Sequence, residues 1–309
     1  IANEIARLVT LEMRSEVVGN EFLNEQYQRV IEDIREVTEY AAAKGGLIFK
    51  PYVDGDRIAV DYVQADLFFP TKYDSSGNIT GCIFVDRKKK GSVIYSRLEH
   101  HELIDGGYRI TNTAYKNTVG DDSLGNRIPL TAVEEWKDLS PEAFIPDVEK
   151  PLYGYFKIPI TNNIDTHSPL GCSVYSRAVN LIKEADKQYS RILWEYEGSE
   201  LAIDASIDVF KLDSSGKPVL PEGKERLFRT YDFDADQGGR KPIEVFSPGI
   251  RDESLFNGLN RLLQRIEFAC GLAYGTLSDM QTVAKTATEI KASKQRTYST
   301  VSDIQKSLE

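Results

Sequence analysis

Two long stretches with helical periodicity constrain this chain most, because each carries an apolar stripe that has to be buried. The first runs from Ser168, a candidate N-cap followed by Pro169, to Gly198, and the second runs from Asp252 to near Gly275. The stripes contain Val174, Ala178, Leu181, Ala185, Tyr189, Ile192 and Tyr196 in the first, and Leu255, Leu259, Leu262, Leu263, Ile266 and Cys270 in the second. A helix of roughly 30 residues spans about 45 Å, which is long for a globular protein.

The segment between the two helices, residues 201–250, returns to strand and turn signals. Its runs ASIDVFKL, ERLFRTYDF and PIEVF are typical of short strands, and turn residues separate them. Because this excursion separates the helices, we expect two antiparallel legs with a small β-containing unit at their far end. A single compact helical bundle is the alternative interpretation.

Residues 1–167 are expected to form a part of their own, with N-terminal helices and a β-rich block. A helix is predicted over residues 21–44, and Gly45 after it suits a left-handed cap. From residue 47 to about residue 115 the pattern changes to short strands and tight turns, with a hairpin turn at Asp54-Gly55. The fold class is therefore predicted to be α+β.

Residues 286–309 predict a last helix that has little to bury, since the stretch is free of Gly and Pro but mostly polar. One edge, interrupted by a lysine, holds Ala287, Ile290, Lys294, Tyr298, Val301 and Leu308, and the opposite face holds Glu289, Arg296, Ser299, Thr300, Asp303 and Ser307. The rest of the chain offers this helix no evident partner. We therefore expect its apolar edge to contact identical copies and its polar face to look into a shared opening.

Composition and charge exclude several classes of function. The chain has 309 residues, 41% of them hydrophobic, which is enough for a sizeable core and suggests about two domains. Its net charge of -10 disfavours a protein that grips nucleic acid, because phosphate affinity comes from Lys and Arg. The charge does not disfavour a protein that nucleic acid slides past. No run approaches the roughly 18 uncharged apolar residues of a membrane span, so no membrane partner is expected.

The sequence carries no recognisable catalytic or structural-metal framework. The cysteines Cys82, Cys172 and Cys270 are odd in number and widely spaced, so neither a disulfide framework nor a zinc site is predicted. His100 and His101 are adjacent and point to opposite faces if they lie on a strand. Phosphate-binding loops and nucleophile elbows are absent. We therefore expect no enzyme activity and no cofactor.

Two charged clusters have alternative interpretations. Asp232, Asp234 and Asp236 match the first ligand positions of a calcium loop, but Gln237 stands where the turn glycine should be. A solvated turn is the preferred interpretation of this cluster. The basic run RKKK, Arg87–Lys90, is interpreted as a solvated hairpin tip, with a phosphate or partner site as the alternative.

The element order, together with three segments, resembles the portal (head–tail connector) proteins of tailed bacteriophages, most of all those of siphophages and prophages of Gram-positive bacteria. The segments are SPLGCSVYSRAVNLIKEADKQYSRILWEYEGSELAI, LNRLLQRIEFACGLAYGTLSD and TVAKTATEIKASKQRTYSTVSDIQ. The resemblance implies a portal-like anatomy of wing 1–167, first stem helix 168–200, clip 201–250, second stem helix 251–277, tunnel loop 278–285 and truncated tunnel helix 286–309. It also implies a crown after the last helix and a few dozen residues before the first.

The function that the resemblance implies is mechanical. About 12 subunits would form a ring around double-stranded DNA at the capsid vertex, for genome packaging, head–tail joining and DNA ejection. Partners would be the terminase, head-completion or adaptor proteins, and the scaffold or major capsid protein. The protein would reside in the virion, and in the host cytoplasm during assembly.

Residue roles follow from the same resemblance. The candidates for the DNA channel are Gln281, Thr282, Lys285, Lys291, Lys294 and Arg296, and those for contacts between subunits are Glu289, Ile290, Tyr298, Val301 and Asp303. Alternatively, several of these cations pair with carboxylates of an adjacent subunit. Two other function classes stay open: a divalent-cation-binding protein or enzyme centred on the Asp232 cluster, and a ring-forming scaffold that never meets DNA.

Overall fold

The computed structural model describes residues 1–223, 225–231, 242–279 and 287–309, without the side chains of residues 226 and 287–293. The fold is mixed α+β, as predicted, with sheets that are antiparallel except for one strand pair. The chain divides into two compact units. Unit 1 comprises Ile1–Arg177, Ala269–Ala273 and Ala284–Glu309, and unit 2 comprises Ala178–Phe268 and Tyr274–Val283.

Unit 1 begins with two helices that pack against each other, α1 (Ala2–Thr10) and α2 (Glu21–Lys44). The side chain of Asn20 caps α2 by accepting a hydrogen bond from the Leu23 amide at 3.0 Å. Gly45, with φ of +93°, ends it in the left-handed conformation, and its N–H donates to the carbonyl of Ala41. The predicted bounds of this helix are therefore confirmed.

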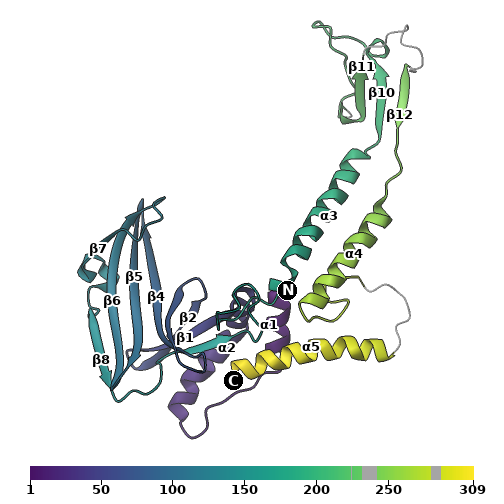
Figure 1. The fold of residues 1–309 in the computed structure, drawn as a ribbon. Coiled ribbons are helices and arrows are strands. Elements are labelled where there is room, and N and C mark those ends of the chain that lie inside the picture. The colour runs from purple at the N-terminus through teal and green to yellow at the C-terminus, as the bar shows by residue number, and fades with distance from the viewer. Residues whose placement is uncertain (224, 232–241, 280–286) are drawn as a thin grey trace. The chain divides into compact units, whose positions relative to one another are not determined.

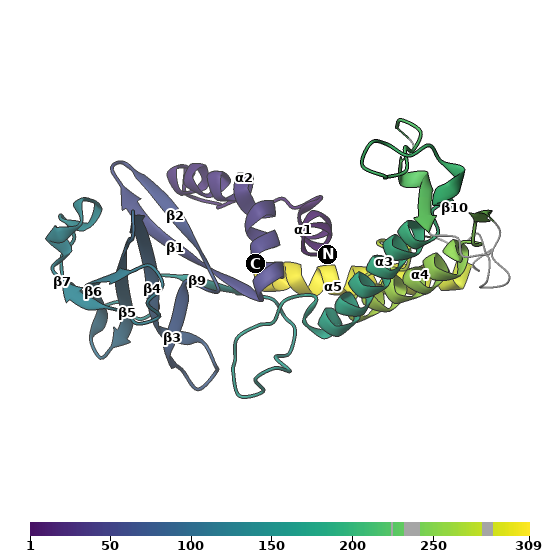
Figure 2. The same cartoon turned by 90° about the horizontal axis from the view of Figure 1, so that it is seen from above.

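Two antiparallel sheets follow these helices in unit 1 (Figure 2). A three-stranded sheet has the order β2-β1-β9, and its β1–β2 hairpin turns at Gly55, where φ is +62°, as expected. A six-stranded sheet has the order β3-β4-β5-β6-β7, with β8 also pairing with β6. The strands are β1 (Gly46–Asp54), β2 (Arg57–Gln64), β3 (Phe68–Tyr73), β4 (Ile79–Lys90), β5 (Val93–Ile104), β6 (Gly107–Thr118), β7 (Asn126–Ile128), β8 (Glu142–Pro146) and β9 (Gly154–Lys157).

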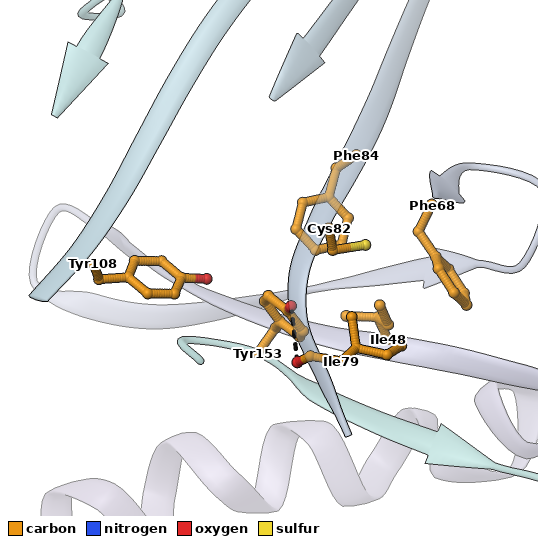
Figure 3. Close-up of a cluster of buried hydrophobic side chains, with 7 residues drawn as sticks. All are labelled: Ile48, Phe68, Ile79, Cys82, Phe84, Tyr108 and Tyr153. Carbon is orange, nitrogen blue, oxygen red and sulfur yellow. Dashed lines mark hydrogen bonds between the residues drawn. The ribbon is translucent and has the colours of Figure 1, made fainter. Parts of the chain in front are cut away.

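A cluster of buried side chains joins the two sheets of unit 1 (Figure 3). It consists of Ile48, Phe68, Ile79, Cys82, Phe84, Tyr108 and Tyr153. The Tyr153 hydroxyl donates to the carbonyl of Ile79 at 3.2 Å, so that its polar end is satisfied inside the core. Burial raises the pKa of the Cys82 thiol to about 12, which keeps it neutral and unreactive.

Unit 2 is built on two long helices, α3 (Val179–Gly198) and α4 (Asp252–Ala269). They run side by side and antiparallel (Figure 1), as the two stripes predict. At one end lies a small sheet in which β10 (Ala202–Ser206) pairs in parallel with β11 (Phe228–Tyr231) and antiparallel with β12 (Ile243–Phe246). The short 3₁₀ helices of the two units are Leu130–Ala132, Glu134–Trp136, Ser176–Ala178, Ile207–Val209 and Glu225–Leu227.

The first long helix begins eleven residues later than the predicted N-cap at Ser168. The hydroxyl of Ser168 accepts from the Leu170 amide at 3.3 Å in a local turn, and residues 169–175 are not helical. A Cβ on Gly171 would lie 2.2 Å from the carbonyl oxygen of Gly45, and the amide of Val174 donates to the carbonyl of Ala42. Contact with the end of α2 therefore replaces the first turns of the expected helix.

Two other expectations need correction. The run Arg87–Lys90 is the last part of β4 rather than a hairpin tip, because it pairs in register with the start of β5. The Lys90 Nζ lies 3.2 Å from a carboxylate oxygen of Glu135. Likewise α4 ends at Ala269 and not near Gly275, since Gly271 has a φ of +72°.

Candidate nucleic-acid interface

The last helix, α5 (Ala287–Leu308), carries those candidate residues that the structure describes. Lys294, Tyr298 and Asp303 are exposed, whereas Arg296 and Val301 are half-buried. The side chains of Glu289, Ile290 and Lys291 are not described, and Gln281, Thr282 and Lys285 lie outside the described residues. Lys294 is therefore the candidate cation that the structure places on an open surface.

The C-terminal half of α5 has partners in its own chain, so the expectation of a helix without partners is wrong there. Ile304 is 1% exposed, and α5 packs against α1 and β9. Gln305 Nε2 donates to the carbonyl of Val9 at 2.8 Å, and the Thr300 hydroxyl donates to the carbonyl of Gly271 at 3.2 Å. The Ser307 hydroxyl donates to the carbonyl of Lys157. Thr300 and Ser307, assigned to the solvent face by their polarity, thus contact neighbouring backbone instead.

Glu267 holds the segment that follows α4. Its side chain is fully buried and accepts hydrogen bonds from the amides of Gly275, Leu277 and Ser278, at 3.1, 2.6 and 2.8 Å, and from the Ser278 hydroxyl at 2.9 Å. Asn260 exchanges two hydrogen bonds with the backbone of Asp279, at 2.8 and 3.2 Å. Residues 275–279, up to the last described residue before the gap, are therefore fixed to α4.

Sequence reasoning missed this anchor. Glu267 lies between the stripe residues Ile266 and Cys270, where a carboxylate would be costly unless it is fully hydrogen-bonded. The sequence does contain a signal for this anchor: a glutamate beside the apolar stripe of a helix, followed by the turn-like run Gly275-Thr276-Leu277-Ser278.

An ion pair fastens the other end of the α3–α4 pair. The Arg251 guanidinium makes a two-point contact with Glu195, at 3.0 Å from Nε and 2.7 Å from Nη2. These hydrogen bonds lower the pKa of Glu195. Midway along the pair, Gln188 Nε2 donates to the carbonyl of Leu255 at 3.3 Å. The two helices are thus joined at several levels.

Only part of the predicted stripe on α3 faces α4. Ala185 and Ile192 are buried, but Tyr189 and Tyr196 are 50% and 39% exposed. Leu193 and Trp194, which are outside the predicted stripe, are also exposed. The pair alone therefore leaves a large part of the apolar surface of α3 in solvent.

A second group of charges lies in unit 1, around Glu99. Its carboxylate lies 3.0 Å from both Lys50 Nζ and Arg97 Nη1, and 2.6 Å from His101 Nε2. Burial alone would raise the pKa of Glu99, but the hydrogen bond from His101 and the charges of Lys50 and Arg97 outweigh it and lower the pKa to about 2. His100 contacts Thr71 on the other face, as the strand geometry predicts.

These charges line a cavity of about 440 Å³ between the two sheets of unit 1. Its cations Lys50 and Arg97 are paired with the carboxylates of Glu99, Asp61 and Asp86, which disfavours a phosphate beside them. His101 bonds to Glu99 and Tyr108 and is 4% exposed, so it is held as a structural residue. A separate apolar cavity of about 500 Å³ lies between α2 and the β1–β2 hairpin.

The alternative metal site is not addressed by the described residues, since Asp232, Asp234 and Asp236 lie outside them. Within the ranges that the structure does describe, no three His, Cys, Asp or Glu side chains gather to hold a metal ion. All three cysteines are buried and free. Among the described helices, none has the length and apolar character needed to cross a membrane.

Comparison with known proteins adds no family assignment. No family model matches the chain, and no curated protein matches it significantly.

Proposed function

We propose that this chain is the subunit of a phage portal, a ring that serves as a DNA conduit at the capsid vertex. The observation that carries the proposal is the α3–α4 pair with its small sheet at one end, followed in the chain by the segment 275–279 that Glu267 and Asn260 hold, and later by the long helix α5. In this interpretation unit 1 supplies the wing and α5 the tunnel helix, the pair is the stem, and β10, β11 and β12 belong to the clip.

The surface of α5 supports a weak contact with DNA. Lys294 is exposed, and the chain as a whole is acidic. Each phosphate that a protein neutralises adds affinity that must be broken when DNA moves, so a conduit needs few cations. The proposed role is therefore passage and not tight binding, and it requires no catalytic residue in this subunit.

Partners and location follow from the same proposal. The ring would pass double-stranded DNA driven by a terminase and would later contact head-completion or adaptor proteins. It would assemble with the scaffold or major capsid protein in the host cytoplasm and remain in the virion.

Electron microscopy of the full-length protein tests the proposal most directly. We expect closed rings with a central opening, of about 12 subunits as the family resemblance implies. Monomers or dimers at every concentration and salt condition would contradict the proposal.

A second experiment addresses contact with DNA. The exposed Lys294 offers a charge reversal, Lys294→Glu, that is expected to leave ring formation intact and reduce the DNA packaged into capsids. Arg296 is less suitable, because it is half-buried and has a partner in the fold. Unchanged packaging by the Lys294→Glu ring would favour a scaffold that does not contact DNA through α5.

The cation-binding alternative is tested separately by calorimetric titration with calcium. Saturable binding that is lost in the Asp232→Asn/Asp234→Asn variant would support it, and an absence of heat would exclude it.

A further inference from the structure

The helix α3 carries a second stripe, and five of its six residues are exposed. Val179, Ile182, Asp186, Tyr189, Leu193 and Tyr196 follow one another at alternating steps of three and four residues. Val179, Tyr189, Leu193 and Tyr196 are 39%, 50%, 47% and 39% exposed. This spacing is that of a helix seam, and Asp186 is the charged residue within it. We call this surface the apolar flank.

The apolar flank lies to one side of the α3–α4 contact. Residues advance by about 100° each around a helix, so Leu193 points about 100° away from the buried Ile192. On α4, Arg265 comes one residue before the buried Ile266. It therefore points about 100° away from Ile266 around the helix axis, by a backward step instead of a forward one. In an antiparallel pair, one step forward on either helix reaches the same side, and one step backward reaches the other side. Leu193 and Arg265 therefore lie on opposite sides of the pair.

The side opposite the apolar flank is basic. Arg261 lies one turn before Arg265 on the same face of α4, and Arg191, one residue before Ile192, adds a third cation from α3. All three arginines are exposed. Among the described residues, no hydrogen bond or ion pair engages the side chains of Asp186, Arg261 or Arg265. We call this surface the basic flank.

The charged residues of the two flanks have opposite signs and lie at similar levels along the axis of the helix pair. Gln188 contacts α4 at Leu255 and Gly258, and Asp186 lies two residues further along α3, toward its N-terminus. The corresponding level on α4 is close to Arg261, within about one helical turn. A copy displaced sideways, without a change of height, would place Asp186 near Arg261.

We propose that the apolar flank of one copy packs against the basic flank of the next, with Asp186 of one chain facing Arg261 of its neighbour. The contact is heterologous, because each copy offers a different surface on each side, and it therefore propagates instead of stopping at a dimer. The inference deepens the proposed function by naming the contact between subunits, but it is carried by the two flanks themselves. The aliphatic parts of the arginines cover apolar surface while their charged ends reach Asp186.

Cross-linking of the full chain tests the contact. Under mild oxidation the Asp186→Cys/Arg261→Cys variant is expected to give a ladder of disulfide-linked species beyond the dimer on a denaturing gel. Neither single variant is expected to pass the dimer, and the native cysteines are buried. The two positions lie on opposite sides of one pair, so a bond within one chain cannot form. A double variant that never passes the dimer would overturn the inference.

A charge exchange supplies an independent test of the same pair. Asp186→Arg or Arg261→Asp alone is expected to weaken association at least about tenfold in analytical ultracentrifugation, because like charges then face each other. The double exchange, Asp186→Arg/Arg261→Asp, should restore association. Lys183→Glu, on the exposed face of α3 that points away from both flanks, is the matched control and should have little effect.

The outcomes separate this inference from the proposed function. Rings that are insensitive to both single charge reversals would refute the flanks and leave the portal proposal standing. A cross-linked ladder from a protein that never packages DNA would support the flanks and refute the conduit. A chain that stays monomeric at all concentrations would refute both.

Discussion

Glu267 illustrates how one buried carboxylate organises the segment after α4. Glu267 is fully buried, and its carboxylate accepts hydrogen bonds from three backbone amides and one hydroxyl. A buried carboxylate is tolerated only where donors satisfy it, and these four hydrogen bonds fix residues 275–278 to the end of α4.

Replacing Glu267 with Ala is expected to lower the free energy of unfolding of unit 2 by about 3 kcal/mol, since the amide and the hydroxyl of the buried Ser278 lose their acceptor. Urea unfolding measures this loss, and hydrogen exchange at the Leu277 and Ser278 amides should accelerate. Glu32→Ala, at an exposed position of α2, is the control and should change stability by less than about 0.5 kcal/mol. Equal effects from the two substitutions would contradict the anchoring role.

The Glu99 cluster makes stability depend on pH. Glu99 has a folded pKa of about 2 against an ordinary value of 4.5, so its contribution is present above about pH 4.5 and is lost as the pH falls toward 2. This difference corresponds to about 3 kcal/mol at neutral pH.

A Glu99→Gln variant is therefore expected to be less stable than the native chain at pH 7, with a deficit that shrinks between about pH 4.5 and pH 2. Urea unfolding of both proteins at pH 7 and pH 3 measures the change. The exposed Glu25, paired with Arg29 on α2, provides a matched Gln control that should show little deficit at either pH. A stability deficit of Glu99→Gln that stays constant with pH would show that the neighbours of Glu99 do not lower its pKa.

At the scale of elements, α5 is divided along its length. Its C-terminal half buries Ile304 and bonds to the backbone of three other segments, whereas Lys294 and Tyr298 nearer its start are exposed. One helix therefore both belongs to the core of unit 1 and presents a free surface.

Two substitutions in α5 should separate these halves. Ile304→Ala is expected to cost about 3 kcal/mol of stability through lost burial and a cavity, whereas Lys294→Glu should stay within about 0.5 kcal/mol. Denaturant unfolding of each variant is the measurement. A large loss from Lys294→Glu would mean that the first half of α5 is also part of the core.

At the scale of the whole molecule, the chain forms two units with separate buried cores. Ile48 belongs to the core of unit 1, and Ile192 is buried between the helices of unit 2. Units with their own cores unfold independently unless a large apolar interface couples them.

Calorimetry of the full chain is expected to resolve two transitions. Ile192→Ala should lower the midpoint of one by roughly 10 °C, and Ile48→Ala should lower the other by a similar amount. A single transition that both substitutions shift together would show that the units unfold as one.

Local patterns determined much of this fold. The bounds of α2 follow from its stripe, from Asn20 before it and from Gly45 after it, and the β1–β2 hairpin follows from its turn residues. The existence and antiparallel order of α3 and α4 follow from their periodicity and from the strands between them. The exposure of Lys294 also follows from its place in a polar helix. These features depend on neighbours a few residues away, which the sequence displays directly.

Tertiary contacts decided the rest, because their partners are distant in the chain and leave no periodic trace. The late start of α3 depends on Gly171 meeting Gly45, and the strand at Arg87–Lys90 depends on pairing with β5. Thr300 and Ser307 are withdrawn from the solvent face by hydrogen bonds to carbonyl groups of remote segments, which polarity scales do not register. A polar side chain leaves the solvent at low cost only where another group satisfies its hydrogen bonds, and only the folded chain brings a distant backbone group near.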